Sequence, residues 1–119
     1  MGYTTNFEGC FKFSRQLTLD EKVKLDHIAE KDWRDDKSKP GYFCQWVSDK
    51  QGMYLEWDEN EKFYCYVEWL EWLIKNFFEP RKIMLNGKAE WEGEEQGDIG
   101  KIIVKDNKVA TKKGKVVYD

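Results

Sequence analysis

The stretch KFYCYVEWLEWLIKNFF at positions 62–78 decides the fold of this chain of 119 residues. Its apolar residues recur at intervals of three and four, which is the spacing of one face of an α-helix. Pro80 follows two residues later and cannot continue the interior of a helix. The stretch therefore predicts an amphipathic helix from residue 62 to about residue 78. Its core stripe consists of Phe63, Val67, Leu70, Ile74 and Phe77.

Two tryptophans of this helix lie outside the stripe. With Phe63 at 0° and 100° per residue, Trp72 falls at about 180°, and Trp69 falls at about 240° on the border of the stripe. A ring in such a position is either covered by another part of the chain or offered to a partner. The polar segment 34–41, which is expected to form a loop, or the C-terminal strands could supply the cover.

Acidic side chains beside these rings point to a binding patch. Glu68 and Glu71 flank the tryptophans, and a ring next to carboxylates suits a cationic or basic partner. We therefore expect a partner-binding site on this helix. The expected residues are Trp72, Trp69, Glu68 and Glu71, with Trp91 and Glu92 as a second choice.

The N-terminal part of the chain predicts a strand followed by a helix. Residues 3–16 hold three phenylalanines among polar residues, which fits an extended strand with a bulge or bend at Gly9. Thr18 and Glu21 have the spacing of a capping box, in which each side chain bonds the backbone amide of the other residue. A helix is therefore expected from residue 19 to about residue 33.

The rest of the chain predicts strands joined by short turns. Residues 42–48 and 52–58 indicate a hairpin around the turn-forming sequence DKQG. Asn86-Gly87 is either a hairpin turn or a kink within one strand. Three further strands are expected at 83–92, 100–105 and 109–117.

The expected order of elements is β–α–β–β–α–β–β–β, in a single α+β domain that spans residues 1–119. Short connections favour a mostly antiparallel sheet of about five to six strands. Two helices cannot cover both faces of such a sheet evenly. We therefore expect both helices on one face, with the other face partly open.

No catalytic, metal or cofactor site is indicated, and we expect a protein that is not an enzyme. The single histidine, His27, lies in the first expected helix with no nucleophile turn or oxyanion loop near it. The cysteines at positions 10, 44 and 65 are widely spaced and form no CxxC pair. They are expected to be free thiols in a reducing cytoplasm rather than zinc ligands. The glycines are scattered and form no phosphate-binding loop.

Five carboxylates gather around Trp91 in one short stretch. Glu90 and Glu92 would share one face of a strand, where their oxygens could hold a calcium or magnesium ion. With Trp91 as a sugar platform they could also serve glycoside hydrolysis. No metal-loop spacing accompanies them, so we prefer a solvated strand edge. The five residues are Glu90, Glu92, Glu94, Glu95 and Asp98.

Charge is distributed unevenly, although the net charge is only −3. Residues 55–98 carry a net charge of −7, whereas residues 99–119 carry +4. The acidic middle disfavours a nucleic acid as the partner. No apolar run approaches the roughly 20 residues that a membrane helix needs, so no membrane association is expected. The first residues do not have the pattern of a secretory signal, which favours a cytoplasmic location.

Four stretches carry a resemblance to known proteins: GYTTNFEG at 2–9, CQW at 44–46, LEWDENEKFYCYVEWLEWLIKNF at 55–77, and LNGKAEWEGEEQGDIGKIIVKDNKV at 85–109. Together they resemble a group of small bacteriophage and prophage accessory proteins. The pattern of that group runs CQW, then EKFYxYxEWLxYLI, then LNGxxxWxGE and DxGxIxV. The resemblance covers most of the chain, although Trp72 stands where tyrosine is commoner. The group has no assigned activity, so no functional residue is carried over.

The resemblance implies an accessory protein that works in the cytoplasm of a bacterial host. Accessory proteins of this size often bind a host protein or protein complex and block a defence system, including CRISPR effectors. We therefore expect a non-enzymatic, anti-CRISPR-like inhibitor. Two alternatives stay open. One is a binder of a small nucleotide-like signal molecule, with rings for stacking and Lys or Arg for phosphate. The other is a structural or homo-oligomeric phage protein, such as a homodimer.

Overall fold

The computed structural model describes residues 3–114 and has the expected α+β fold. All six strands lie in one antiparallel sheet, in the order β2-β3-β1-β4-β5-β6. The predicted order of elements is confirmed. The elements are β1 (Thr5–Phe13), α1 (Leu19–Glu30), β2 (Trp46–Ser48), β3 (Tyr54–Trp57), α2 (Tyr66–Leu73), β4 (Leu85–Gly93), β5 (Ile99–Lys105) and β6 (Lys108–Lys113).

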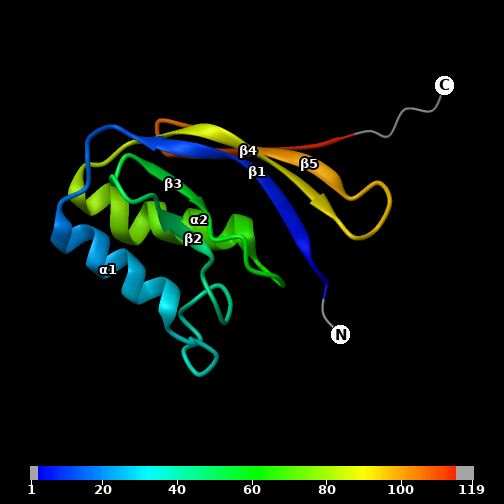
Figure 1. Cartoon of the computed structure of the whole chain (residues 1–119), viewed down its shortest axis with the longest axis horizontal. Coiled ribbons are helices and arrows are strands. Elements are labelled where there is room, and N and C mark those ends of the chain that lie inside the picture. The colour runs from blue at the N-terminus through cyan, green and yellow to red at the C-terminus, as the bar shows by residue number, and fades with distance from the viewer. Residues whose placement is uncertain (1–2, 115–119) are drawn as a thin grey trace.

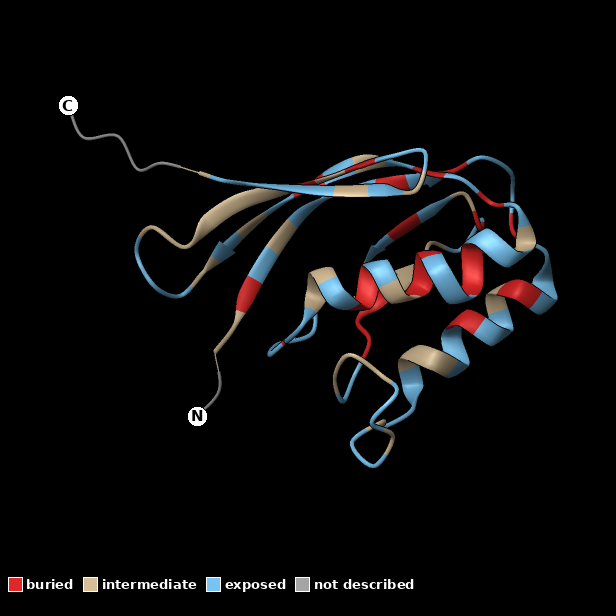
Figure 2. Cartoon of the chain, turned by 180° about the vertical axis from the view of Figure 1, so that it is seen from behind, coloured by how far each residue is buried: buried red, intermediate tan, exposed pale blue. Residues whose placement is uncertain are grey.

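The two helices lie on the same side of the sheet, as Figure 1 shows. The long segment between α1 and β2 also lies on that side. Among the described residues, no helix or loop crosses the opposite side, as the two views in Figures 1 and 2 show. The sheet therefore has one face that packs on the core and one face that stays open, which confirms the prediction from the element count.

The long central strands β1 and β4 pair without interruption, from Thr5 opposite Gly93 to Phe13 opposite Leu85. The bulge considered at Gly9 is therefore absent. Gly9 has φ +118°, and a Cβ there would lie 2.4 Å from the carbonyl oxygen of Lys88. The glycine thus permits a close approach of two strands that a side chain would prevent.

Asn86-Gly87 is not a hairpin turn, because both residues lie inside β4. Gly87 pairs with Phe11 and has φ +150°. A Cβ on Gly87 would meet the carbonyl oxygen of Cys10 at 2.5 Å. The alternative that places both residues within one strand is therefore right, and the neighbouring strand is the reason that glycine is needed here.

The second helix differs from the prediction at both ends. It begins at Tyr66 instead of residue 62, because Cys65 has left-handed backbone angles. After Leu73 it continues as a π-helical turn (Ile74–Phe78) and then a 3-10 turn (Glu79–Arg81) that contains Pro80. The wider π turn directs both Phe77 and Phe78 into the core, although they are neighbours in sequence.

The observed bounds of α1, β2 and β6 also differ from the predicted ones. The first helix ends at Glu30 rather than near residue 33. The expected strand 42–48 is reduced to β2, because the carbonyl of Tyr42 accepts a hydrogen bond from the amide of Trp33 instead of joining the sheet. The last strand ends at Lys113, and the part of its prediction that falls on residues 115–117 lies outside the described residues.

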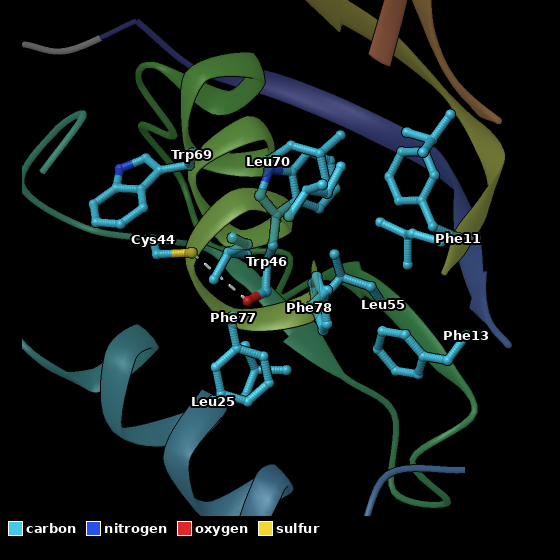
Figure 3. Packing of buried hydrophobic residues seen from close by; sticks show 14 of the residues in the cluster. Phe11, Phe13, Leu25, Cys44, Trp46, Leu55, Trp69, Leu70, Phe77 and Phe78 are labelled. Carbon is cyan, nitrogen blue, oxygen red and sulfur yellow. Dashed lines mark hydrogen bonds between the residues drawn. The ribbon is translucent and has the colours of Figure 1, made fainter. Parts of the chain in front are cut away.

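Aromatic rings fill the core between the sheet and the helices (Figure 3). Phe7 of β1 makes edge-to-face contacts with Trp46 and Phe63, with ring centroids 5.3 and 5.9 Å apart. Trp46 is fully buried, and its indole N–H donates to the carbonyl of Tyr66 at 2.8 Å. Leu70 of α2 is also fully buried, as the stripe predicted. Edge-to-face contacts between rings stabilise the core by more than the buried apolar area alone provides.

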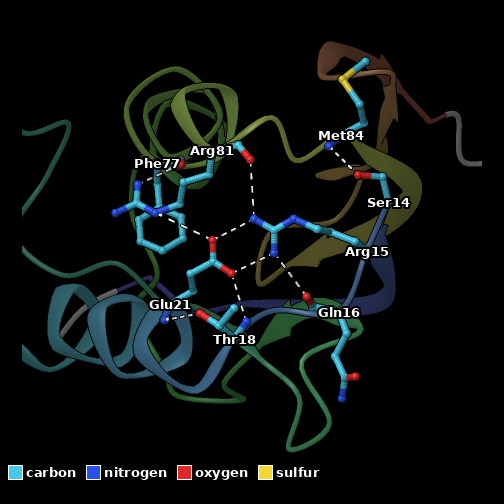
Figure 4. Close-up of polar contacts among 8 residues, drawn as sticks. All are labelled: Ser14, Arg15, Gln16, Thr18, Glu21, Phe77, Arg81 and Met84. Carbon is cyan, nitrogen blue, oxygen red and sulfur yellow. Dashed lines mark hydrogen bonds and ion pairs between the residues drawn. The ribbon is translucent and has the colours of Figure 1, made fainter.

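A carboxylate ties the start of α1 to the chain before and after it (Figure 4). Glu21 completes the predicted capping box with Thr18 and accepts two hydrogen bonds of 2.8 Å from the guanidinium of Arg15. Arg81 lies 3.9 Å from the same carboxylate and donates to the carbonyl of Phe77 at 3.0 Å. These contacts hold the pKa of Glu21 at about 2, mainly through the Arg15 hydrogen bonds.

Candidate functional site

The predicted patch on α2 is only partly at the surface. Trp69 is fully buried, so it does not offer the exposed ring that the predicted patch requires. The helix is covered on two sides, by the sheet and by the segment that leads from α1 to β2. Gly41 of that segment packs on the indole, where a Cβ would lie 3.1 Å from Nε1 of Trp69. The helical spacing of apolar residues predicts only the side of α2 that packs on the sheet, not the side that packs on this segment.

Trp72 is half-buried under the same segment. The ammonium of Lys39 lies 5.0 Å from the centre of the Trp72 ring, and the rings of Trp72 and Trp69 meet edge to face at 5.7 Å. The predicted loop 34–41 therefore covers part of Trp72, which is the first of the two alternatives that the sequence left open. Glu68 and Glu71 are exposed, and neither forms an ion pair within residues 3–114.

Trp91 and Glu92 do not share a surface, because they point to opposite faces of β4. The ring of Trp91 lies on the helix side, 5.9 Å from that of Tyr66, and its indole N–H donates to the carboxylate of Asp98 at 3.0 Å. Tyr3 donates its hydroxyl proton to the same carboxylate at 2.6 Å. Glu92 is exposed on the open face of the sheet.

The structure reveals a site that the sequence did not predict, a cleft of about 490 Å³ beside the N-terminus of α2. Three aromatic side chains line this aromatic cleft: Tyr42, Phe43 and Tyr64 are 58, 44 and 50% exposed. The remaining lining residues are Pro40, Gly41, Gln45, Glu61, Lys62 and Cys65. Exposed rings that gather in one concave place are typical of binding sites.

The sequence pattern does not predict this cleft, for two reasons. The sequence pattern predicts a helix over residues 62–65, and it predicts a strand that alternates between core and solvent at Tyr42 and Phe43. The Pro-Gly pair at positions 40 and 41 was the available signal, because it favours a turn directly before the two rings.

One buried side chain joins the two walls of the aromatic cleft. Gln45 donates from its amide nitrogen to the carbonyl of Glu61 at 2.9 Å and accepts at its oxygen from the indole of Trp57 at 3.2 Å. Gln45 is only 7% exposed. A buried amide with both ends bonded fixes the distance between the segments that it connects.

The wall that carries Tyr64 has an unusual backbone. Glu59, Lys62 and Cys65 have φ values of 68, 63 and 57°, all in the left-handed region that non-glycine residues avoid. Each such residue costs on the order of 1 kcal/mol or more, and such residues concentrate at functional sites. No side chain caps the first turn of α2.

Charged residues of both signs lie at the aromatic cleft: Glu61 and Lys62 line it, and the guanidinium of Arg34 lies 5.3 Å from the centre of the Tyr42 ring. Asp58, Glu59 and Glu61 precede the wall, and Glu68 lies on the first turn of α2. The carboxylate of Asp58 accepts a hydrogen bond from the amide of Asn60 at 2.9 Å. The four carboxylates, which we call the acidic rim, outnumber the two cations, and their charge favours a basic partner.

The thiols are not activated. Partial burial and the nearby Glu68 raise the pKa of Cys65, and burial raises the pKa of Cys44 to about 12. Thiolates are the reactive form of cysteine, so neither position suits nucleophilic chemistry. His27 is exposed on α1. Within residues 3–114, no three His, Cys, Asp or Glu side chains are grouped so that they could hold a metal ion.

Comparison with protein-family models, curated proteins and solved structures finds no match to this chain. Among the helices of residues 3–114, none is long and apolar enough to cross a membrane.

Proposed function

We propose that this protein is a non-enzymatic, phage-type accessory protein that binds a basic surface of a host protein through the aromatic cleft. The observation that carries the proposal is the gathering of three exposed rings in one cleft. Within residues 3–114, four other large apolar side chains are exposed, and they do not line the cleft. They are Leu19 and Val23 on α1, Tyr54 on β3 and Met84 before β4.

The acidic rim supports a basic partner. Negative charge beside an apolar centre steers a positively charged surface toward it and raises the association rate. Proteins that bind nucleic acid carry basic surfaces, and host defence effectors that act on phage DNA or RNA belong to this class. Together with the resemblance to phage accessory proteins, the rim supports a role as a defence inhibitor.

The rings would supply most of the binding energy. Tyrosines and other aromatic residues are enriched among the interface residues that cost most on truncation. The Gln45 bridge to Glu61 and Trp57 supports a cleft that is formed before the partner arrives, which lowers the entropy cost of binding.

The test compares infection and capture with matched variants. A double variant, Tyr42→Ser with Phe43→Ser, removes two rings of the aromatic cleft. The control, Leu19→Ser, removes a side chain that is 74% exposed on α1. Each is expressed in a host that carries a defence system, and phage plating and the amount of the co-purified defence protein are measured.

The wild type and the control should both raise the efficiency of phage plating, and both should co-purify the same defence protein. The cleft variant should lose at least about tenfold of the captured protein, as loss of central rings does. Equal capture by the cleft variant and the wild type would contradict the assignment of the site. Unchanged plating with the wild type across defence systems would contradict the role as an inhibitor.

A small nucleotide-like ligand is the second candidate, favoured by one further observation. The aromatic cleft is within the usual size range of small-molecule sites, and Lys62 lines it beside the rings. Rings could stack on a base while the ammonium meets a phosphate. Thermal melting with a panel of mono- and dinucleotides separates the two candidates, because only a ligand that binds the native state raises the melting temperature.

A further inference from the structure

The open face of the sheet carries a row of four charged residues in a fixed order. Glu8 of β1 pairs with Glu90 of β4, Glu90 with Lys101 of β5, and Lys101 with Lys112 of β6. The neighbouring residues Phe7, Ala89 and Ile102 pack on the core, and Lys112 is in register with Lys101, so all four side chains point away from the helices. Across the sheet, the order of charges is therefore minus, minus, plus, plus.

This order is unfavourable for the isolated sheet. Like charges directly opposite each other on neighbouring strands destabilise the pair, and the row contains two such pairs. Within residues 3–114, none of the four side chains forms an ion pair. A depression of about 710 Å³ lies over the row, and all four residues line it. The arrangement suits an external partner with the opposite order of charges.

A second copy of the chain offers that opposite order. A twofold axis that runs along the boundary between β4 and β5, between two facing sheets, reverses the row of one copy over the row of the other. Glu90 then faces Lys101 of the second copy, and Glu8 faces Lys112. We propose that the open face is a homodimer interface in which these pairs meet across the twofold axis.

The neighbouring row fits the same axis. It contains Cys10, Lys88, Ile103 and Ala110, in that order across the four strands. Reversal places the aliphatic part of Lys88 over Ile103 and places Cys10 over Ala110. Facing sheets pack about 10 Å apart, which leaves room for such long side chains to interleave.

A more distant row supplies an internal control. Lys12 of β1 pairs with Asn86 of β4, and Lys108 of β6 pairs with Lys105 of β5; extending the β4–β5 register by one residue puts the two pairs in one row. The proposed axis would bring Lys12 toward Lys108 of the second copy, which is unfavourable. Two aligned sheets cross at about 30°, so they diverge with distance from the centre of contact. The interface is therefore centred on the row with Glu8 and Lys112.

Sedimentation equilibrium on the full chain tests the proposal. At about 0.1 mM protein and low salt, where screening is weak, the wild type should be dimeric, and added salt should weaken the dimer. Lys101→Glu and Glu90→Lys should each weaken dimerisation by about tenfold or more, because each change replaces two attractions by two repulsions. Lys108→Glu should leave the dimer unchanged or make it tighter, since it opposes Lys12.

The decisive arm mixes the two single variants. In a mixed dimer, Lys at position 90 of one copy faces Glu at position 101 of the other, and Glu90 faces Lys101, so both contacts return. The equimolar mixture should therefore form a dimer that neither variant forms alone. If Glu90→Lys does not fold, the pair Glu8→Lys and Lys112→Glu replaces it in the same design. A monomeric wild type, or a mixture that stays monomeric, would overturn the proposal.

Discussion

The ammonium of Lys39 lies 5.0 Å from the centre of the Trp72 ring. The same ammonium lies 4.6 Å from the centre of the Trp33 ring, so one lysine holds the segment after α1 against two aromatic side chains. Its side chain is only 13% exposed. This contact is the reason that Trp72 belongs partly to the core and not wholly to a binding surface.

Lys39→Ala is predicted to lower the free energy of unfolding by about 1–2 kcal/mol, the range of a partly desolvated cation–π contact. Lys37→Ala is the control, because Lys37 is exposed in the same segment. Its effect should stay within about 0.5 kcal/mol, as for other surface positions. Urea denaturation measures both. Equal effects of the two variants would show that Lys39 does not hold the segment on Trp72.

Stability is predicted to fall in acid through Glu21. Its pKa is about 2 in the folded protein but about 4.5 when the contacts are absent. The unfolded state therefore takes up this proton first, and the stabilisation, complete above about pH 5, is lost as the pH falls toward 2. With allowance for the exposed partner Arg15, the loss is about 2 kcal/mol.

The variant Glu21→Gln isolates this contribution. It should be less stable than the wild type at pH 7, and the difference should shrink between pH 5 and pH 2. Asp20→Asn is the control, because Asp20 is exposed on the same turn of α1. A difference between Glu21→Gln and the wild type that stays constant with pH would contradict the assigned pKa.

Lys62→Gly is predicted to leave stability unchanged or raise it by up to about 1 kcal/mol. Glycine adopts the left-handed angles of this position without the steric cost that lysine bears, which offsets its greater freedom in the unfolded chain. Lys75→Gly, in the helical turn after α2, should instead cost about 1 kcal/mol. Thermal melting of the two variants checks the backbone of the cleft wall.

Thiol titration is predicted to find three free thiols in the denatured chain without reductant, because all three cysteines are free. In the folded protein Cys44 should resist modification, since it is 1% exposed and burial raises its pKa to about 12. Cys10 and Cys65 are exposed and should react. Rapid reaction of all three in the native state would contradict the buried position of Cys44.

The order of elements was predictable because local signals mark them. The capping box at Thr18 and Glu21 starts α1, and the apolar spacing around Leu70 identifies α2. Pairing partners were not predictable from such signals, because they depend on residues far apart in sequence. Gly87 illustrates this point: its place inside β4 is explained by the backbone of Cys10 on the neighbouring strand.

The candidate site was harder to predict than the fold. The position of Trp69 depends on Gly41 of a distant segment, which turns a ring at the border of the helix stripe into a core residue. The aromatic cleft depends on left-handed angles at Lys62 and Cys65, residues with no intrinsic preference for them. Such conformations come from tertiary contacts, so the sequence pattern around Tyr64 indicated a helix.

Site-specific photocrosslinking in infected host cells tests directly whether the protein binds a host partner through the aromatic cleft. A benzophenone amino acid replaces Phe43 in the aromatic cleft or, as the control, Val23, which is 58% exposed on α1. Binding through the cleft should give one crosslinked host protein from position 43 and none of that protein from position 23. No crosslink from position 43, or the same product from both positions, would contradict the proposal that the protein acts by binding a host partner through this cleft.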